Sequence, residues 1–127
     1  MITIEFNKLV RNKLSKVLTD HQVIVSSTIL TADQFIQKLK EKIVEEAKEV
    51  QAADINQELI IEIADLCEAI DTLIKICHID KQDVENAKIK KKEEIGCFTK
   101  ESYINNIEVV ENNTEVIDYL RSKGKIK

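Results

Sequence analysis

The sequence has no proline, no tryptophan and only two glycines, Gly96 and Gly124. β-Sandwiches and β-barrels need frequent turns, which are usually built with glycine and proline, so this scarcity argues against an all-β fold and favours long helices. The phosphate-binding loops of P-loop and Rossmann proteins need several glycines close together and are excluded for the same reason. Aromatic residues make up 4% of the chain, so we expect an aliphatic core.

Further absences limit the location and the partners. The 3 cysteines are odd in number and widely spaced, which fits neither a disulfide framework nor a zinc knuckle and favours a reducing compartment. No apolar run approaches the roughly 18 residues of a membrane span, and the first residues lack the basic and apolar regions of a signal peptide. We therefore expect a cytoplasmic protein that has no membrane partner. A net charge of −4 argues against nucleic acid as a partner.

What the chain does contain is typical of one globular domain. Its 127 residues are 43% hydrophobic and 33% charged, and a chain of this length can bury its own core. Capping residues and apolar spacing predict helices from near Lys8 with Asn7 as N-cap, from Thr31 to about Ala53, from Asp54 or Asn56 to about Cys77, from Asp80 to about Glu94, and from Thr114 to Ser122. Residues 1–127 are therefore predicted to form a single all-α domain, a helical bundle of about four main helices. The helix over 56–77 is apolar on more than one side, which predicts a central position against several neighbours.

Carboxylates stand at unusual places in the two longest predicted helices. Glu46 falls on the apolar stripe of its helix, and Glu49 lies one turn further on. Glu62 and Asp65 are three residues apart among isoleucines and Leu66. A short connection makes the two helices antiparallel, so the pairs can converge, and converging carboxylates need a cation to stay ionised. Oxygen ligands favour Mg²⁺, with Mn²⁺ as a second choice. The alternative is an ordinary solvated acidic face, which stays open.

Three segments resemble one protein family. Residues 45–49 (EEAKE) are followed after 12 residues by 62–65 (EIAD), which is similar to the EExxE…ExxD signature of the all-α nucleoside triphosphate pyrophosphatases. That superfamily includes the MazG-like, dimeric dUTPase-like and phosphoribosyl-ATP pyrophosphohydrolase-like proteins. Residues 7–13 (NKLVRNK) and 91–98 (KKEEIGCF) resemble the NKLVRDK opening and the KREERGGF ending of one phosphoribosyl-ATP pyrophosphohydrolase-like branch. The resemblance covers about residues 7–110 and leaves a tail of about residues 111–127.

The resemblance implies an activity and a set of roles. Members of the family cleave a nucleoside triphosphate between the α and β phosphates, giving a monophosphate and pyrophosphate. Their acidic residues hold Mg²⁺, which implies Glu46, Glu49, Glu62 and Asp65 as metal ligands. Glu45 is the spare carboxylate, as a neighbouring group or as the base that accepts a proton from water. Members commonly form dimers or tetramers, so the resemblance implies a homodimer or a homotetramer, which the apolar helix over 56–77 would suit.

An acidic site that binds a polyanion also needs basic residues. The candidates for phosphate contacts are Lys8, Arg11, Lys13, Lys88, Lys91 and Lys92. Arginine can hold a phosphate through two hydrogen bonds, which favours Arg11. A run of lysines on a helix is more often a solvated face, and this alternative applies to the three late lysines.

The sequence also departs from the pattern of that branch. Asn12 replaces an aspartate, Ser15 a proline, Ile95 an arginine and Cys97 a glycine. A second reading is therefore a catalytically weak or inactive module of the same family that binds a nucleotide or metal, or only oligomerises. A third reading, a nucleic-acid-binding helical protein, would use the late lysines and conflicts with the net charge.

Overall fold

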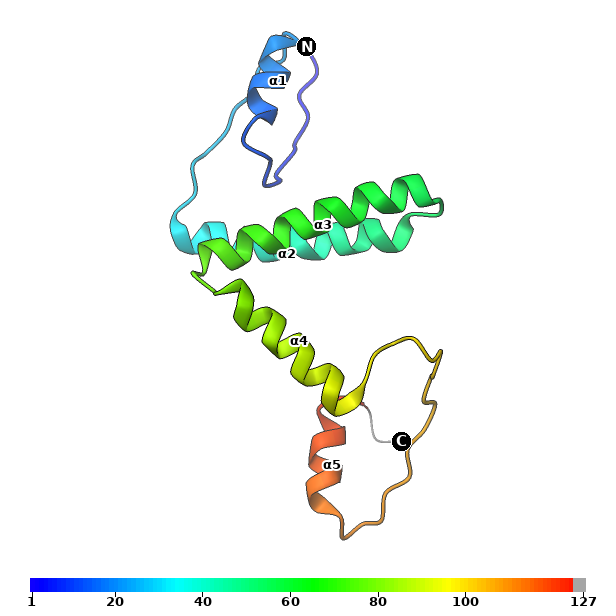
Figure 1. Cartoon of the computed structure of the whole chain (residues 1–127). Coiled ribbons are helices and arrows are strands. Elements are labelled where there is room, and N and C mark those ends of the chain that lie inside the picture. The colour runs from blue at the N-terminus through cyan, green and yellow to red at the C-terminus, as the bar shows by residue number, and fades with distance from the viewer. Residues whose placement is uncertain (125–127) are drawn as a thin grey trace. The chain divides into compact units, whose positions relative to one another are not determined.

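The computed structural model describes residues 1–124 and shows a chain built from helices alone (Figure 1). Residues 1–124 contain five helices and no strand: α1 (Leu14–Asp20), α2 (Ala32–Ala52), α3 (Asn56–Ile76), α4 (Lys81–Ile95) and α5 (Thr114–Arg121). The predicted all-α class is confirmed, and α2, α3 and α4 begin and end within two residues of their predicted limits.

The chain divides into two compact units, Met1–Ala87 and Lys88–Lys127. The first unit contains α1, α2, α3 and the beginning of α4, and the second contains the rest of α4 and α5. The boundary between the two units lies within α4, between residues 87 and 88. The extent of the family resemblance had instead suggested a tail that begins near residue 111. That residues 1–127 act as a single domain stays a prediction.

Helix α2 begins where the sequence predicts because its first turn is capped on both sides. The Thr31 hydroxyl accepts a hydrogen bond from the Gln34 backbone N–H at 3.3 Å, and the Gln34 side chain accepts one from the Thr31 N–H at 3.0 Å. This reciprocal pair satisfies two of the donors that a helix start leaves free. Residues 53–55 connect α2 to α3, and the two helices lie side by side as an antiparallel hairpin (Figure 1).

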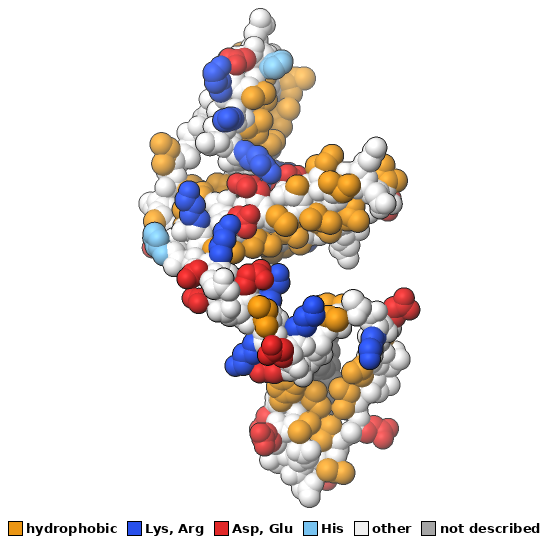
Figure 2. Space-filling model, viewed as in Figure 1, with side chains coloured by type: hydrophobic (Ala, Val, Ile, Leu, Met, Phe, Trp, Pro, Cys, Tyr) orange, Lys and Arg blue, Asp and Glu red, His pale blue; other side chains and the backbone are white. Residues whose placement is uncertain are grey.

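The hairpin buries less than the sequence suggests. Leu39 of α2 and Ala69 of α3 are the only buried hydrophobic residues in the described chain. Among the described helices, α2 is also the only one that packs extensively on α3. The predicted central position of this helix against several neighbours is therefore wrong for the described chain, and Ile60 keeps 67% of its surface exposed. Hydrophobic side chains lie uncovered along the hairpin in the space-filling view (Figure 2).

Residues 7–13, here called the basic arm, form no helix, although a helix beginning near Lys8 was predicted. Asn7 has a φ of +47°, whereas an N-cap residue normally has extended backbone, so Asn7 does not cap a helix here. Helix α1 begins only at Leu14. The basic arm is therefore free to run along other elements of the first unit.

The remaining helices follow local signals. The Asp80 carboxylate accepts a hydrogen bond from the Gln82 backbone N–H at 2.9 Å, as expected for the residue before α4. Gly96 follows α4 with a φ of +83°, a conformation that favours glycine at a helix end. Neither α4 nor α5 contains a buried residue. Within residues 1–124, no helix is both long and apolar enough to cross a membrane.

Candidate functional site

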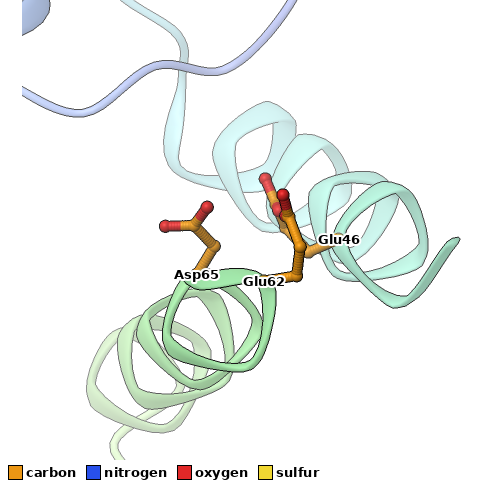
Figure 3. Close-up of side chains that lie close together, drawn as sticks. All are labelled: Glu46, Glu62 and Asp65. Carbon is orange, nitrogen blue, oxygen red and sulfur yellow. The ribbon is translucent and has the colours of Figure 1, made fainter. Parts of the chain in front are cut away.

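Three carboxylates from α2 and α3 form a compact group, here called the acidic triad. Glu46 comes from α2, and Glu62 and Asp65 come from α3 (Figure 3). One carboxylate oxygen of each residue lies within 4.8 Å of the other two, and all three residues are half-buried. Glu62 and Asp65 share one side of α3 because they are three residues apart, and the antiparallel hairpin brings Glu46 opposite them.

The charges of these carboxylates disfavour one another. The pKa of Glu62 is raised above its ordinary value of 4.5, first by partial burial and then by the negative charges of Glu49, Asp65, Glu46 and Glu58. A raised pKa means that the ionised form is destabilised where it stands. A divalent cation among these oxygens would offset the repulsion. The donor set is all carboxylate oxygen, which suits a hard ion such as Mg²⁺.

The sequence predicted four metal ligands, and the structure brings three of them together. Glu49 is exposed and lies outside the acidic triad, although its negative charge contributes to the raised pKa of Glu62. Its role as a metal ligand stays a prediction. Glu49 lies one turn of α2 beyond Glu46.

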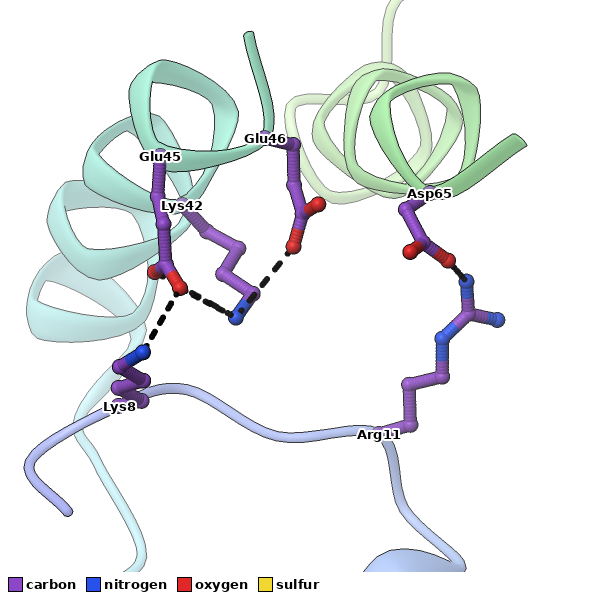
Figure 4. A network of polar contacts seen from close by, with 6 residues as sticks. All are labelled: Lys8, Arg11, Lys42, Glu45, Glu46 and Asp65. Carbon is purple, nitrogen blue, oxygen red and sulfur yellow. Dashed lines mark hydrogen bonds and ion pairs between the residues drawn. The ribbon is translucent and has the colours of Figure 1, made fainter. Parts of the chain in front are cut away.

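Positive side chains surround the acidic triad. The Lys42 Nζ lies 3.5 Å from a Glu46 oxygen and 3.4 Å from a Glu45 oxygen. Two residues of the basic arm add to this network, because Lys8 pairs with Glu45 at 3.2 Å and Arg11 pairs with Asp65 at 2.8 Å (Figure 4). The basic arm thus contacts α2 through one ion pair and α3 through the other.

Glu45 has an environment opposite to that of Glu62. Burial acts to raise the pKa of Glu45, but the hydrogen bonds and charges of Lys8 and Lys42 outweigh it, and the pKa is lowered. A carboxylate with a lowered pKa holds a proton poorly. Glu62, with its raised pKa, holds a proton more readily than Glu45 in the cation-free site.

A hollow of about 720 Å³ lies beside the acidic triad in the first unit. Its lining combines acidic, basic and apolar side chains from the basic arm, α1, α2 and α3. The charged lining residues are Arg11, Lys13, Lys42, Glu46, Asp65 and Glu68. The apolar lining residues are Phe6, Leu9, Val10, Leu14, Val17, Phe35, Leu39 and Ala69. An apolar surface next to paired charges suits a ligand with one flat, apolar part and one charged part.

The six predicted basic residues divide between the two units. Lys8, Arg11 and Lys13 belong to the first unit, where Arg11 and Lys13 line the hollow and Lys8 pairs with Glu45. The other three, Lys88, Lys91 and Lys92, lie on the part of α4 that belongs to the second unit, so their phosphate contacts stay predictions.

Lys42 was missed as a site residue by the sequence reasoning. Its side chain is only 24% exposed and it touches two of the predicted acidic residues. The signal that could have found it is its position four residues before Glu46, on the same side of the helix. Comparisons of the chain with family models, with curated proteins and with solved structures found no match.

Proposed function

We propose that this protein is a Mg²⁺-dependent nucleoside triphosphate pyrophosphohydrolase. The proposed reaction cleaves the bond between the α and β phosphates with water and gives a nucleoside monophosphate and pyrophosphate. The observation that carries the proposal is the acidic triad at the edge of a hollow that also holds Arg11 and Lys42. The resemblance of residues 7–13, 45–49 and 62–65 to the all-α pyrophosphatases supports the choice of substrate class.

The parts of the hollow suit the parts of a nucleoside triphosphate. The phosphates need positive charge, which Arg11, Lys13 and Lys42 provide at its wall. The base needs a flat apolar surface, and the aromatic rings of Phe6 and Phe35 line the same space. When bound, Mg²⁺ neutralises phosphate oxygens and lowers the pKa of water in its reach.

The chain's own residues would then perform three tasks. The acidic triad holds the cation, and Lys42 pairs with Glu46 and orients its carboxylate. Arg11 and Lys42 bind phosphate oxygens and stabilise the charge that develops on the departing pyrophosphate. Glu62 is a cation ligand in this arrangement, and the cation offsets the desolvation and the negative charges that raise its pKa in the free site. Glu45, held between Lys8 and Lys42 and outside the triad, is the spare carboxylate that accepts the proton of the attacking water.

We also infer that the protein assembles as a homodimer or homotetramer. Four exposed residues at helical spacing, Ile60, Ile63, Cys67 and Ile70, form an apolar stripe along α3. Continuous apolar surface of this kind is uncommon on a monomer and marks a contact surface. A second copy that presents the same stripe would cover it by two-fold symmetry.

The direct test is pyrophosphate release from a panel of ribo- and deoxyribonucleoside triphosphates, with and without Mg²⁺. We expect release only with Mg²⁺, and a decrease of about 10²- to 10³-fold in kcat/KM for Glu62→Gln. Asp71→Asn is the matched control, because it removes a carboxylate from the same helix at an exposed site outside the acidic triad. This control should keep the full rate.

Two results would count against the enzyme. No release from any nucleotide by the folded chain would exclude the proposed reaction for that panel. Thermal protection by a non-hydrolysable triphosphate with Mg²⁺, in the absence of product, would then favour the nucleotide-binding module. Release that Glu62→Gln leaves unchanged would place the chemistry outside the acidic triad.

A further inference from the structure

The basic arm contacts the helical hairpin through two ion pairs. Lys8 pairs with Glu45 of α2, and three residues later Arg11 pairs with Asp65 of α3 (Figure 4). The arm has no helical hydrogen bonds of its own between Lys8 and Arg11. Its position over the hairpin therefore depends on side-chain contacts, among them these two ion pairs.

The Lys8–Glu45 and Arg11–Asp65 ion pairs would respond differently to a bound cation. Asp65 is a member of the acidic triad, so its negative charge is shared between the guanidinium of Arg11 and any cation that the triad holds. Two positive groups beside one carboxylate repel each other. Glu45 lies outside the triad, so its partners Lys8 and Lys42 do not share its charge with a cation held there.

We propose that Arg11 is a latch that exchanges partners. Without a ligand it neutralises Asp65, and when a divalent cation enters the acidic triad it leaves Asp65 and pairs with a phosphate oxygen of the nucleotide in the hollow. The Lys8–Glu45 pair stays formed and acts as the pivot of the arm. This inference rests on the proposed function, since it requires that the triad binds a cation and that the hollow binds a phosphate.

The proposal has a consequence for the order of binding. A cation alone must displace Arg11 and leave the guanidinium without a counter-charge, so the site resists an isolated cation. A cation that arrives with a triphosphate supplies the new partner for Arg11 at the same time. Cation and nucleotide therefore bind with positive coupling, and Arg11 is the residue through which the coupling acts.

Arg11→Gln tests the latch because the two ligands should respond in opposite directions. We expect the full-length variant to bind Mn²⁺ alone about two- to fivefold more tightly than the wild type, since no exposed ion pair has to be broken. Affinity for a non-hydrolysable triphosphate analogue in excess Mn²⁺ should decrease about 10- to 100-fold, the value of a charged hydrogen bond. The free Mn²⁺ signal in electron paramagnetic resonance measures the first affinity, and calorimetry measures the second.

Two further variants serve as controls. Lys16→Gln removes the same charge from the N-terminal segment, but Lys16 pairs with Asp20 inside α1, at 2.8 Å, and does not line the hollow. It should change neither affinity. Arg11→Lys keeps the charge, and its Mn²⁺ affinity should return toward that of the wild type.

The outcomes separate the latch from the proposed function. If Arg11→Gln and the wild type bind Mn²⁺ equally, or the variant binds it more weakly, the latch is wrong while the metal site stands. If neither protein binds Mn²⁺, the metal site of the proposed function is wrong, and the latch with it. Opposite shifts in the two affinities support both.

Discussion

Helix α3 has one side with partly buried carboxylates and another side with exposed isoleucines, the reverse of the usual pattern of burial. On one flank Glu62 and Asp65 are half-buried beside Glu46, although charged groups are normally left in water. On the other flank Ile60 and Ile63 remain 67% and 45% exposed, although such side chains are normally covered. We call these the acidic flank and the apolar flank.

Each flank has a surface that is costly in an isolated chain and favourable with a partner. The acidic flank gains from a cation, because partial burial and then neighbouring negative charges raise the pKa of Glu62. The apolar flank gains from a second apolar surface. Under the two proposals above, α3 presents two separate binding surfaces, and its packing against α2 holds both flanks in place.

The largest effect is expected from a change in the packing of α2 on α3, which supports both flanks. Leu39 is 3% exposed and belongs to α2, the helix that packs on α3, so Leu39→Ala should cost about 2–4 kcal/mol of unfolding free energy. Both pyrophosphate release and self-association should decrease with it. Urea unfolding measures the loss, and Val44→Ala, at a residue 54% exposed on the same helix, should cost under about 0.5 kcal/mol. A cost below about 1 kcal/mol for Leu39→Ala would show that the hairpin is held elsewhere.

A second test separates the flanks by placing one charge on either side of α3. Ile60→Asp puts a carboxylate on the apolar flank and should weaken self-association about 30-fold, as expected for a central contact residue. Ile61→Asp is chemically identical and its site is also exposed, at 59%, but helical spacing turns it away from the apolar stripe. It should leave association unchanged. Sedimentation velocity at several concentrations measures both, and equal effects of the two variants would contradict a contact through this flank.

The smallest effect concerns pH and the acidic flank alone. Because the folded chain holds the Glu62 proton more tightly than the unfolded chain, it binds more protons between pH 4.5 and the raised pKa, and stability decreases as pH rises through that interval. Without metal, Glu62→Gln should therefore unfold at a higher temperature than the wild type at pH 7.5, and the advantage should disappear near pH 4. Thermal unfolding in EDTA measures this.

The same experiment has an internal check. Added Mg²⁺ should reduce the advantage of Glu62→Gln at pH 7.5, because the cation stabilises the ionised form of the wild-type residue. Glu41→Gln, at an exposed carboxylate of α2 that pairs with Lys38, should show no such reversal. A metal-free Glu62→Gln protein that is less stable than the wild type at pH 7.5 would show that Glu62 is not disfavoured in its place.

Local signals explain why much of the fold was predictable. The Thr31–Gln34 capping box, the Asp80 cap and Gly96 act over three or four residues, and the structure has each of them where the pattern indicated. The i, i+3 spacing of Glu62 and Asp65 likewise fixes their common side on any helix. The short connection at residues 53–55 then makes the hairpin antiparallel, and three of the four predicted ligands meet.

The basic arm shows what local signals could not supply. Asn7 and the apolar residues that follow suggest a helix, but the arm is not helical in the structure. Its Lys8 and Arg11 instead pair with Glu45 and Asp65, which lie 37 and 54 positions further along the chain. Lys42 and the lining of the hollow also depend on contacts between elements.

The main helices, their caps and the side of each helix on which the acidic residues lie could thus be derived from the sequence, because they follow from backbone hydrogen bonds and the 3.6-residue period. Packing between elements sets the rest: Glu49 stays outside the triad, the pKa values of Glu45 and Glu62 shift in opposite directions, and Arg11 meets Asp65. Charge interactions depend on distance through space, and distance between separate elements is set by packing.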